Sequence, residues 1–129
     1  MTRCTSRDHT REEALKDGRL IDVTTTALDA RFRNPVALTR AAWAHAVAWD
    51  STHPEPQEEA ARLWDVLYMA GIAARGAAGE KSVLFDLYRV PNDERPRFWH
   101  EAERVTLRLT IGPGDQGEPV VTIQSTEEE

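Results

Sequence analysis

The clearest chemical pattern in the chain is a glycine-rich run, Gly112-Pro113-Gly114-Asp115-Gln116-Gly117, which has G-x-G-x-x-G spacing. In dinucleotide-binding proteins this spacing follows a strand and opens a helix whose N-terminal amides receive the pyrophosphate. Here Glu118 and Pro119 follow and then a strand pattern at 120–124, so the helix is missing. Asp115 and Glu118 would also repel phosphate. The run is therefore predicted to be a hairpin loop, and we expect no cofactor.

Four histidines and one cysteine are the residues most able to bind a metal ion or act as a nucleophile. The histidines are His9, His45, His53 and His100. None has the H-x₃-H or H-E-x-x-H spacing that sets two ligands on one helical face. Cys4 is alone, which rules out an intrachain disulfide and a thiolate-built metal site. With no G-x-S-x-G sequence either, we expect no metal site and no catalytic residue, and the chain is predicted not to be an enzyme.

A third group of residues is suited to binding a partner. Trp99 lies between two predicted strands with arginines and a histidine beside it, which is typical of an interface anchor. The alternative is that Trp99 folds back over the sheet edge. Arginines and threonines alternate on the polar side of the following strand. The candidate interaction residues are Arg89, Arg95, Arg97, Trp99, His100, Arg104, Arg108, Asp115 and Glu118.

The charge of the chain restricts its partners. The formal net charge is −6 over 129 residues, and the C-terminus is Glu127-Glu128-Glu129. Nucleic-acid binding depends on Lys and Arg neutralising phosphates, so direct binding of nucleic acid is not expected and a protein partner is. No run approaches the ~18 apolar residues of a membrane span. We expect a cytoplasmic protein, and the oligomeric state stays open.

The elements that would position these residues begin with short helices. Thr10 and Glu13 have capping-box spacing and Gly18 is a natural terminator, which predicts a helix over 10–17. A short strand is expected at 20–23, and Thr24 is predicted to cap a helical turn after it. Thr39 is predicted to cap a helix that runs to about residue 49.

The longest predicted helix begins near Pro56 and ends at the Gly76–Gly79 stretch. Its apolar stripe includes Leu63 and Trp64, which are expected in the core, whereas Arg62 is expected to lie elsewhere on the helix.

After residue 82 the apolar period changes to two. Apolar and polar residues alternate over 82–88, 104–111 and 120–124, which predicts strands with one buried and one wet face. The expected fold is α+β, with helices in the N-terminal half packed on a C-terminal three- to four-stranded antiparallel sheet. Residues 10–125 would form one domain, between a flexible tail at 1–9 and an acidic tail at 126–129.

Several separate segments, spread over residues 10–123, together carry a family resemblance. They are Thr10-Arg11-Glu12-Glu13-Ala14 with Asp17-Gly18, Leu20-Ile21-Asp22-Val23, Phe32-Arg33, Pro35-Val36-Ala37-Leu38-Thr39, Arg62-Leu63-Trp64-Asp65-Val66-Leu67, Phe85, Leu87-Tyr88-Arg89-Val90-Pro91, Gly112-Pro113-Gly114-Asp115 and Gly117-Glu118-Pro119-Val120. The chain resembles a family of small proteins of unknown function carried on bacterial plasmids, phages and other mobile elements. That resemblance implies no catalytic residues.

Two functions are therefore expected in competition. The first is a non-enzymatic protein-interaction module of a mobile genetic element, in its narrower form an inhibitor of host defence of the anti-CRISPR or anti-restriction kind. Its partner would be a protein, such as a nucleic-acid-binding complex. The alternative is an accessory factor in plasmid or phage DNA handling that contacts nucleic acid through an arginine-bearing sheet face.

Overall fold

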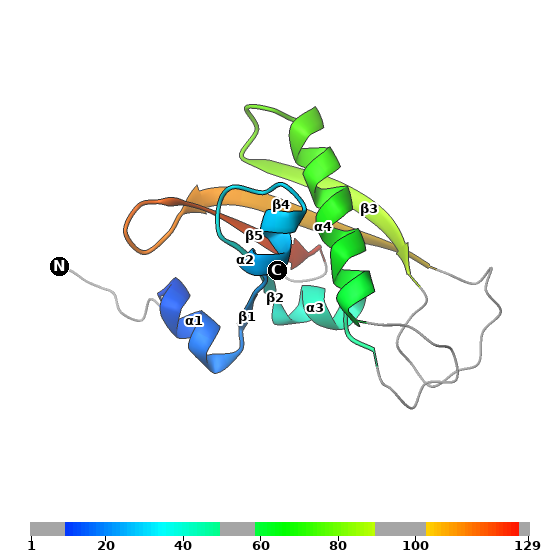
Figure 1. Cartoon of the computed structure of the whole chain (residues 1–129), viewed down its shortest axis with the longest axis horizontal. Coiled ribbons are helices and arrows are strands. Elements are labelled where there is room, and N and C mark those ends of the chain that lie inside the picture. The colour runs from blue at the N-terminus through cyan, green and yellow to red at the C-terminus, as the bar shows by residue number, and fades with distance from the viewer. Residues whose placement is uncertain (1–9, 50–58, 90–102, 127–129) are drawn as a thin grey trace.

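The structure is a computed structural model that describes residues 10–49, 59–89 and 103–126. The helices in these ranges are α1 (Arg11–Asp17), α2 (Thr24–Asp29), α3 (Arg40–Ala46) and α4 (Glu59–Gly76). The strands are β1 (Leu20–Asp22), β2 (Val36–Thr39), β3 (Ser82–Arg89), β4 (Glu103–Pro113) and β5 (Pro119–Ser125). The predicted α+β class is confirmed, with the helices before the three longest strands (Figure 1).

The sheet differs from the predicted one in size and in direction. It has five strands in the order β1-β2-β5-β4-β3, and β2 runs parallel to β5 with Val36 opposite Val121. The expectation of a three- to four-stranded antiparallel sheet was therefore wrong. The first three residues of β2 are buried, so this strand lacks the polar–apolar alternation by which strands are recognised. Its parallel partner also lies more than 80 residues away along the chain, beyond the reach of local patterns.

Two of the three predicted N-cap residues, Thr10 and Thr39, are confirmed. Thr10 and Glu13 form the complete capping box of α1, and Gly18 ends this helix in the left-handed conformation, with φ of 87°. The Thr39 hydroxyl accepts a hydrogen bond from the Ala42 amide at 3.1 Å and caps α3. Thr24 does not cap α2 but is its first residue, so this predicted cap was wrong. Its hydroxyl donates to the Asp22 carboxylate at 2.6 Å and accepts from the Val36 amide at 3.1 Å. α3 ends at Ala46, three residues earlier than expected.

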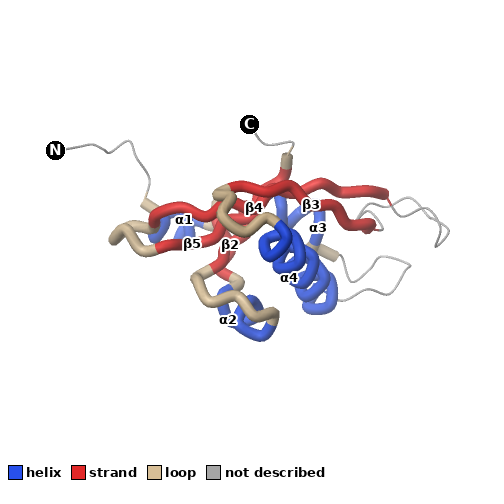
Figure 2. Tube along the Cα trace, turned by 90° about the horizontal axis from the view of Figure 1, so that it is seen from above, coloured by secondary structure: helices blue, strands red, loops and turns tan. Residues whose placement is uncertain are grey.

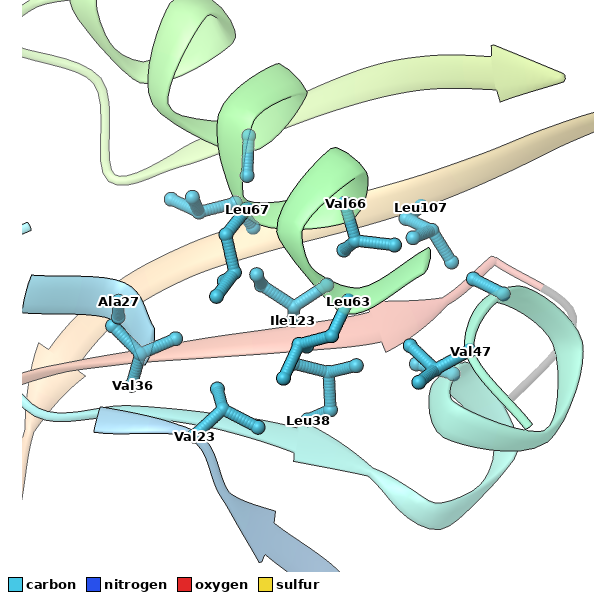
Figure 3. Packing of buried hydrophobic residues seen from close by; sticks show 14 of the residues in the cluster. Val23, Ala27, Val36, Leu38, Val47, Leu63, Val66, Leu67, Leu107 and Ile123 are labelled. Carbon is cyan, nitrogen blue, oxygen red and sulfur yellow. The ribbon is translucent and has the colours of Figure 1, made fainter. Parts of the chain in front are cut away.

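The core lies between the sheet and three helices. Figure 2 shows α2 and α4 on one side of the sheet. α3 contacts β2 and β5, and its buried residues belong to the same hydrophobic core. Leu63, Val66 and Leu67 of α4 point toward Leu107 and Ile123 of the sheet (Figure 3). Each such side chain contributes roughly 1.5–3 kcal/mol when buried. We call this side the inner face and the opposite side the outer face.

Two residues at the start of α4 exchange their predicted places. Arg62 is only 2% exposed, whereas Trp64 is 40% exposed, so the expected core position of Trp64 was wrong. Arg62 Nε donates to the Val47 carbonyl at 2.9 Å, and its guanidinium lies 4.8 Å from the centroid of the Trp49 ring. The segment after α3 thus passes beside the start of α4, where its Val47 carbonyl and Trp49 ring contact the Arg62 guanidinium. Helical periodicity within α4 cannot show that contact.

Candidate interaction surface

The outer face of β3 and β4 carries large side chains that no described helix covers. Along β3, Phe85 and Leu87 are buried on the inner face, so Leu84 and Tyr88 project from the outer face. These two side chains are 55% and 67% exposed. A single exposed apolar residue needs no explanation, but two on one strand form part of a surface.

The arginines of β4 lie on the same face. Arg104 is opposite Tyr88, and Arg108 is opposite Leu84, because β3 and β4 pair in antiparallel register. Between these pairs, the Thr106 hydroxyl donates to the Asp86 carboxylate at 2.6 Å. The sequence had predicted that the arginines and threonines of β4 share this face. The structure adds Tyr88 and Leu84 of β3, which lie opposite the two arginines. We define the outer-face patch as Leu84, Asp86, Tyr88, Arg104, Thr106 and Arg108.

Asp115 and Glu118 lie far from this patch, in the loop between β4 and β5, which confirms that the glycine-rich run is a hairpin loop. Pro113, at the end of β4, lies five residues beyond Arg108 and nine beyond Arg104, which corresponds to roughly 17 Å and 30 Å of extended strand. The Asp115 carboxylate accepts hydrogen bonds from the backbone amides of Arg11 at 2.9 Å and Glu12 at 3.0 Å. Asp115 therefore ties the first turn of α1 to the hairpin, as Figure 1 shows by their proximity.

The side chain of Arg11 completes this junction. Its two terminal nitrogens donate to the Thr122 hydroxyl at 2.8 Å and to the Val121 carbonyl at 2.9 Å. Burial lowers the pKa of the Arg11 guanidinium below its ordinary value, and the nearby carboxylates of Asp115, Asp22 and Glu118 oppose that shift. We call Arg11, Asp115 and Thr122 the α1 junction.

An open depression of about 370 Å³ lies beside the α1 junction. Leu15, Pro35 and Val120 are among the residues lining it, and so is the Glu118 side chain, which also accepts a hydrogen bond from the Gln116 amide at 2.9 Å. The carboxylates of Asp115 and Glu118 accept hydrogen bonds from backbone amides and lie near the partly buried guanidinium of Arg11. The arrangement joins α1 to the sheet.

A second open depression, of about 730 Å³, lies between α1 and α3 and includes Arg19, Arg40 and His45. Arg40 Nε donates to the Gly18 carbonyl at 3.1 Å, and Arg19 Nε donates to Asp17 at 2.8 Å. His45 Nδ1 lies 3.2 Å from the Ser125 hydroxyl. Arg40 therefore holds the α1–β1 turn against α3, Arg19 bonds within that turn, and His45 joins α3 to β5.

The predicted interaction residues are thus divided by the structure. Arg104 and Arg108 share the outer-face patch, and Asp115 and Glu118 belong to the hairpin loop. Arg95, Arg97, Trp99 and His100 lie outside the described residues, and of Arg89 only its backbone place at the end of β3 is described.

The sequence placed Leu84 and Tyr88 on the face of β3 opposite the apolar one, but they were not among the predicted interaction residues. The signal that identifies them is their position in the polar register of β3, beside buried Phe85 and Leu87.

Within the residues that the structure describes, no three His, Cys, Asp or Glu side chains are arranged to hold a metal ion. Likewise, none of the described helices has the length and apolar character required to cross a membrane.

Comparison with known proteins places the chain in a family but not in a functional class. No curated protein matches it significantly, and no solved structure does. A family model described as a family of unknown function, DUF6573, matches residues 6–129, which is nearly the whole chain. The chain therefore belongs to DUF6573, a family of unknown function.

Proposed function

We propose that the protein is a non-enzymatic interaction module that binds another protein through the outer-face patch. The observation that carries this proposal is the exposure of Tyr88 and Leu84 opposite Arg104 and Arg108. Tyrosine and arginine are the residue types enriched at the energetic centres of protein interfaces. The strands of the sheet also present these side chains on an ordered backbone, so binding requires no backbone ordering, which favours affinity.

The rest of the surface supports a partner with a basic region. The net charge of −6 would steer the chain toward an arginine- or lysine-lined surface and would raise the association rate at low salt. We propose, as the finer form of this function, a protein of a mobile genetic element that acts in the cytoplasm. It would inhibit host defence in the anti-CRISPR or anti-restriction manner by occupying the nucleic-acid-binding face of a nuclease complex.

The test combines capture and protection. The tagged full chain is mixed with purified defence nuclease complexes, and its expression is tested for protection of a targeted plasmid. Tyr88→Ala in the outer-face patch should weaken binding by about 30-fold, corresponding to about 2 kcal/mol at an interface centre. Tyr68→Ala is the matched control, because Tyr68 is similarly exposed, at 53%, but lies on α4. Equal binding by both variants would refute the use of this patch.

One observation favours the alternative function, DNA handling. Tyr88 and Arg104 lie opposite each other. In proteins that bind single-stranded nucleic acid, an aromatic ring stacks on a base and a neighbouring arginine neutralises a phosphate. The patch also contains two arginines and one aspartate, which makes it locally basic in an acidic chain. A titration with labelled single-stranded DNA decides between the two. Saturable binding that weakens steeply with salt and is lost in Arg104→Ala would replace the first proposal.

A further inference from the structure

The open edge of the sheet is formed by β3. Of the described strands only β4 pairs with it, over all eight residues from Ser82 opposite Thr110 to Arg89 opposite Glu103. The Lys81 carbonyl accepts from the Ile111 amide at 2.9 Å, so the odd-numbered residues direct their backbone groups toward β4. The amides and carbonyls of the even-numbered residues, Ser82 to Tyr88, therefore point to the open edge.

This edge lacks the features that normally prevent strand addition. Residues 82–88 contain no proline and no lysine, and the uninterrupted register with β4 leaves no bulge. Asp86 is the single charge among them. The opposite edge of the sheet is β1, which has only three residues and is protected by its shortness. β3 is thus the edge that is open to pairing.

We propose that β3 pairs antiparallel with β3 of a second copy of this chain, which joins two five-stranded sheets into one. A two-fold axis at Phe85 generates the register. Phe85 lies opposite the second copy's Phe85, Val83 opposite its Leu87, and Leu84 opposite its Asp86. The even-numbered residues then exchange their free amides and carbonyls in the alternating pattern of antiparallel strands.

Charge and exposure select this register over its neighbour. A two-fold axis at Asp86 would put two carboxylates directly opposite each other, which destabilises a strand pair. With the axis at Phe85, Leu84 becomes a diagonal neighbour of the second copy's Leu84 and Tyr88, within reach of long and aromatic side chains. The pairing therefore partly covers the two exposed apolar side chains of β3, which are 55% and 67% exposed in the single chain.

Sedimentation of the full chain over a concentration series tests the dimer. A strand-pair interface is near the low end of interface size, so we expect a micromolar dissociation constant. Raising the salt concentration should tighten it, because each copy carries a net charge of −6 and salt screens their repulsion. A chain that remains a monomer at several hundred micromolar would overturn the proposal.

Three variants test the register. Leu84→Asp sets two pairs of carboxylates opposite each other and should raise the dissociation constant about tenfold or more. Adding Asp86→Lys to this variant converts both pairs into opposite charges and should restore the dimer. Tyr68→Asp adds the same charge to α4 and should leave the dimer unchanged.

The outcomes separate the possibilities. A dimer that Leu84→Asp does not weaken, or that the double variant fails to restore, would exclude the Phe85-centred register. Circular dichroism of each variant should show that the monomer remains folded, since all three substituted side chains are exposed. The strand pair and the proposed function share Leu84, Asp86 and Tyr88, whereas Arg104 lies on β4 and takes no part in the strand pair. Sedimentation of the chain alone tests the dimer without a partner, and Arg104→Ala tests partner binding without altering the strand pair.

Discussion

Replacing Asp115 by alanine should release α1 from the sheet. The substitution removes both hydrogen bonds that this carboxylate accepts, from the Arg11 amide at 2.9 Å and the Glu12 amide at 3.0 Å. The helix capping box satisfies the Glu13 amide instead, so no other described side chain takes over the first two amides. Loss of a helix cap costs roughly 0.5–2 kcal/mol, and loss of a negative charge at a helix N-terminus roughly 0.3–1 kcal/mol. Because Asp115 is exposed and water replaces part of the interaction, we expect a total of about 2 kcal/mol.

Equilibrium unfolding in urea measures this change. With a urea dependence of roughly 1–3 kcal/mol per molar for a small protein, a loss of about 2 kcal/mol lowers the midpoint by about 1 M. Hydrogen exchange should then show the amides of α1 losing protection while those of α4 keep theirs. Asp29→Ala, at the exposed end of α2, is the control and should change stability by less than about 0.5 kcal/mol. The proposed role of Asp115 is refuted if its variant behaves like that control.

Three further substitutions test the packing. Arg62→Ala should destabilise the fold by about 3 kcal/mol in urea unfolding, because it removes a buried side chain that bonds a carbonyl and stacks on Trp49. Gly114→Ala places a Cβ 2.5 Å from a Glu118 carboxylate oxygen and should lower the free energy of unfolding. The loss should be smaller when Glu118 is also replaced by alanine. Equal losses in both backgrounds would contradict this contact. Gly18→Ala should cost about 1 kcal/mol, measured as a lower thermal midpoint, because φ there is 87°.

Local signals predicted the elements that depend on neighbouring residues. The capping box of α1, the Thr39 cap of α3 and the hairpin loop after β4 were each predicted from a few adjacent side chains. The alternation along β4 likewise identified Arg104 and Arg108 as residues of one face. These features are governed by hydrogen bonds and side-chain directions within a few residues, which a single sequence displays.

The chain's amino-acid order alone therefore determined the caps of α1 and α3, the hairpin and the division of the late strands into buried and wet faces. Only the tertiary structure decided the parallel pairing of β2 with β5, the burial of Arg62, and the use of Asp115 to cap a helix 104 residues away. The physical reason is that these contacts join segments distant in the chain. Their stability comes from complementary groups on two elements, and periodicity within one element does not contain that information.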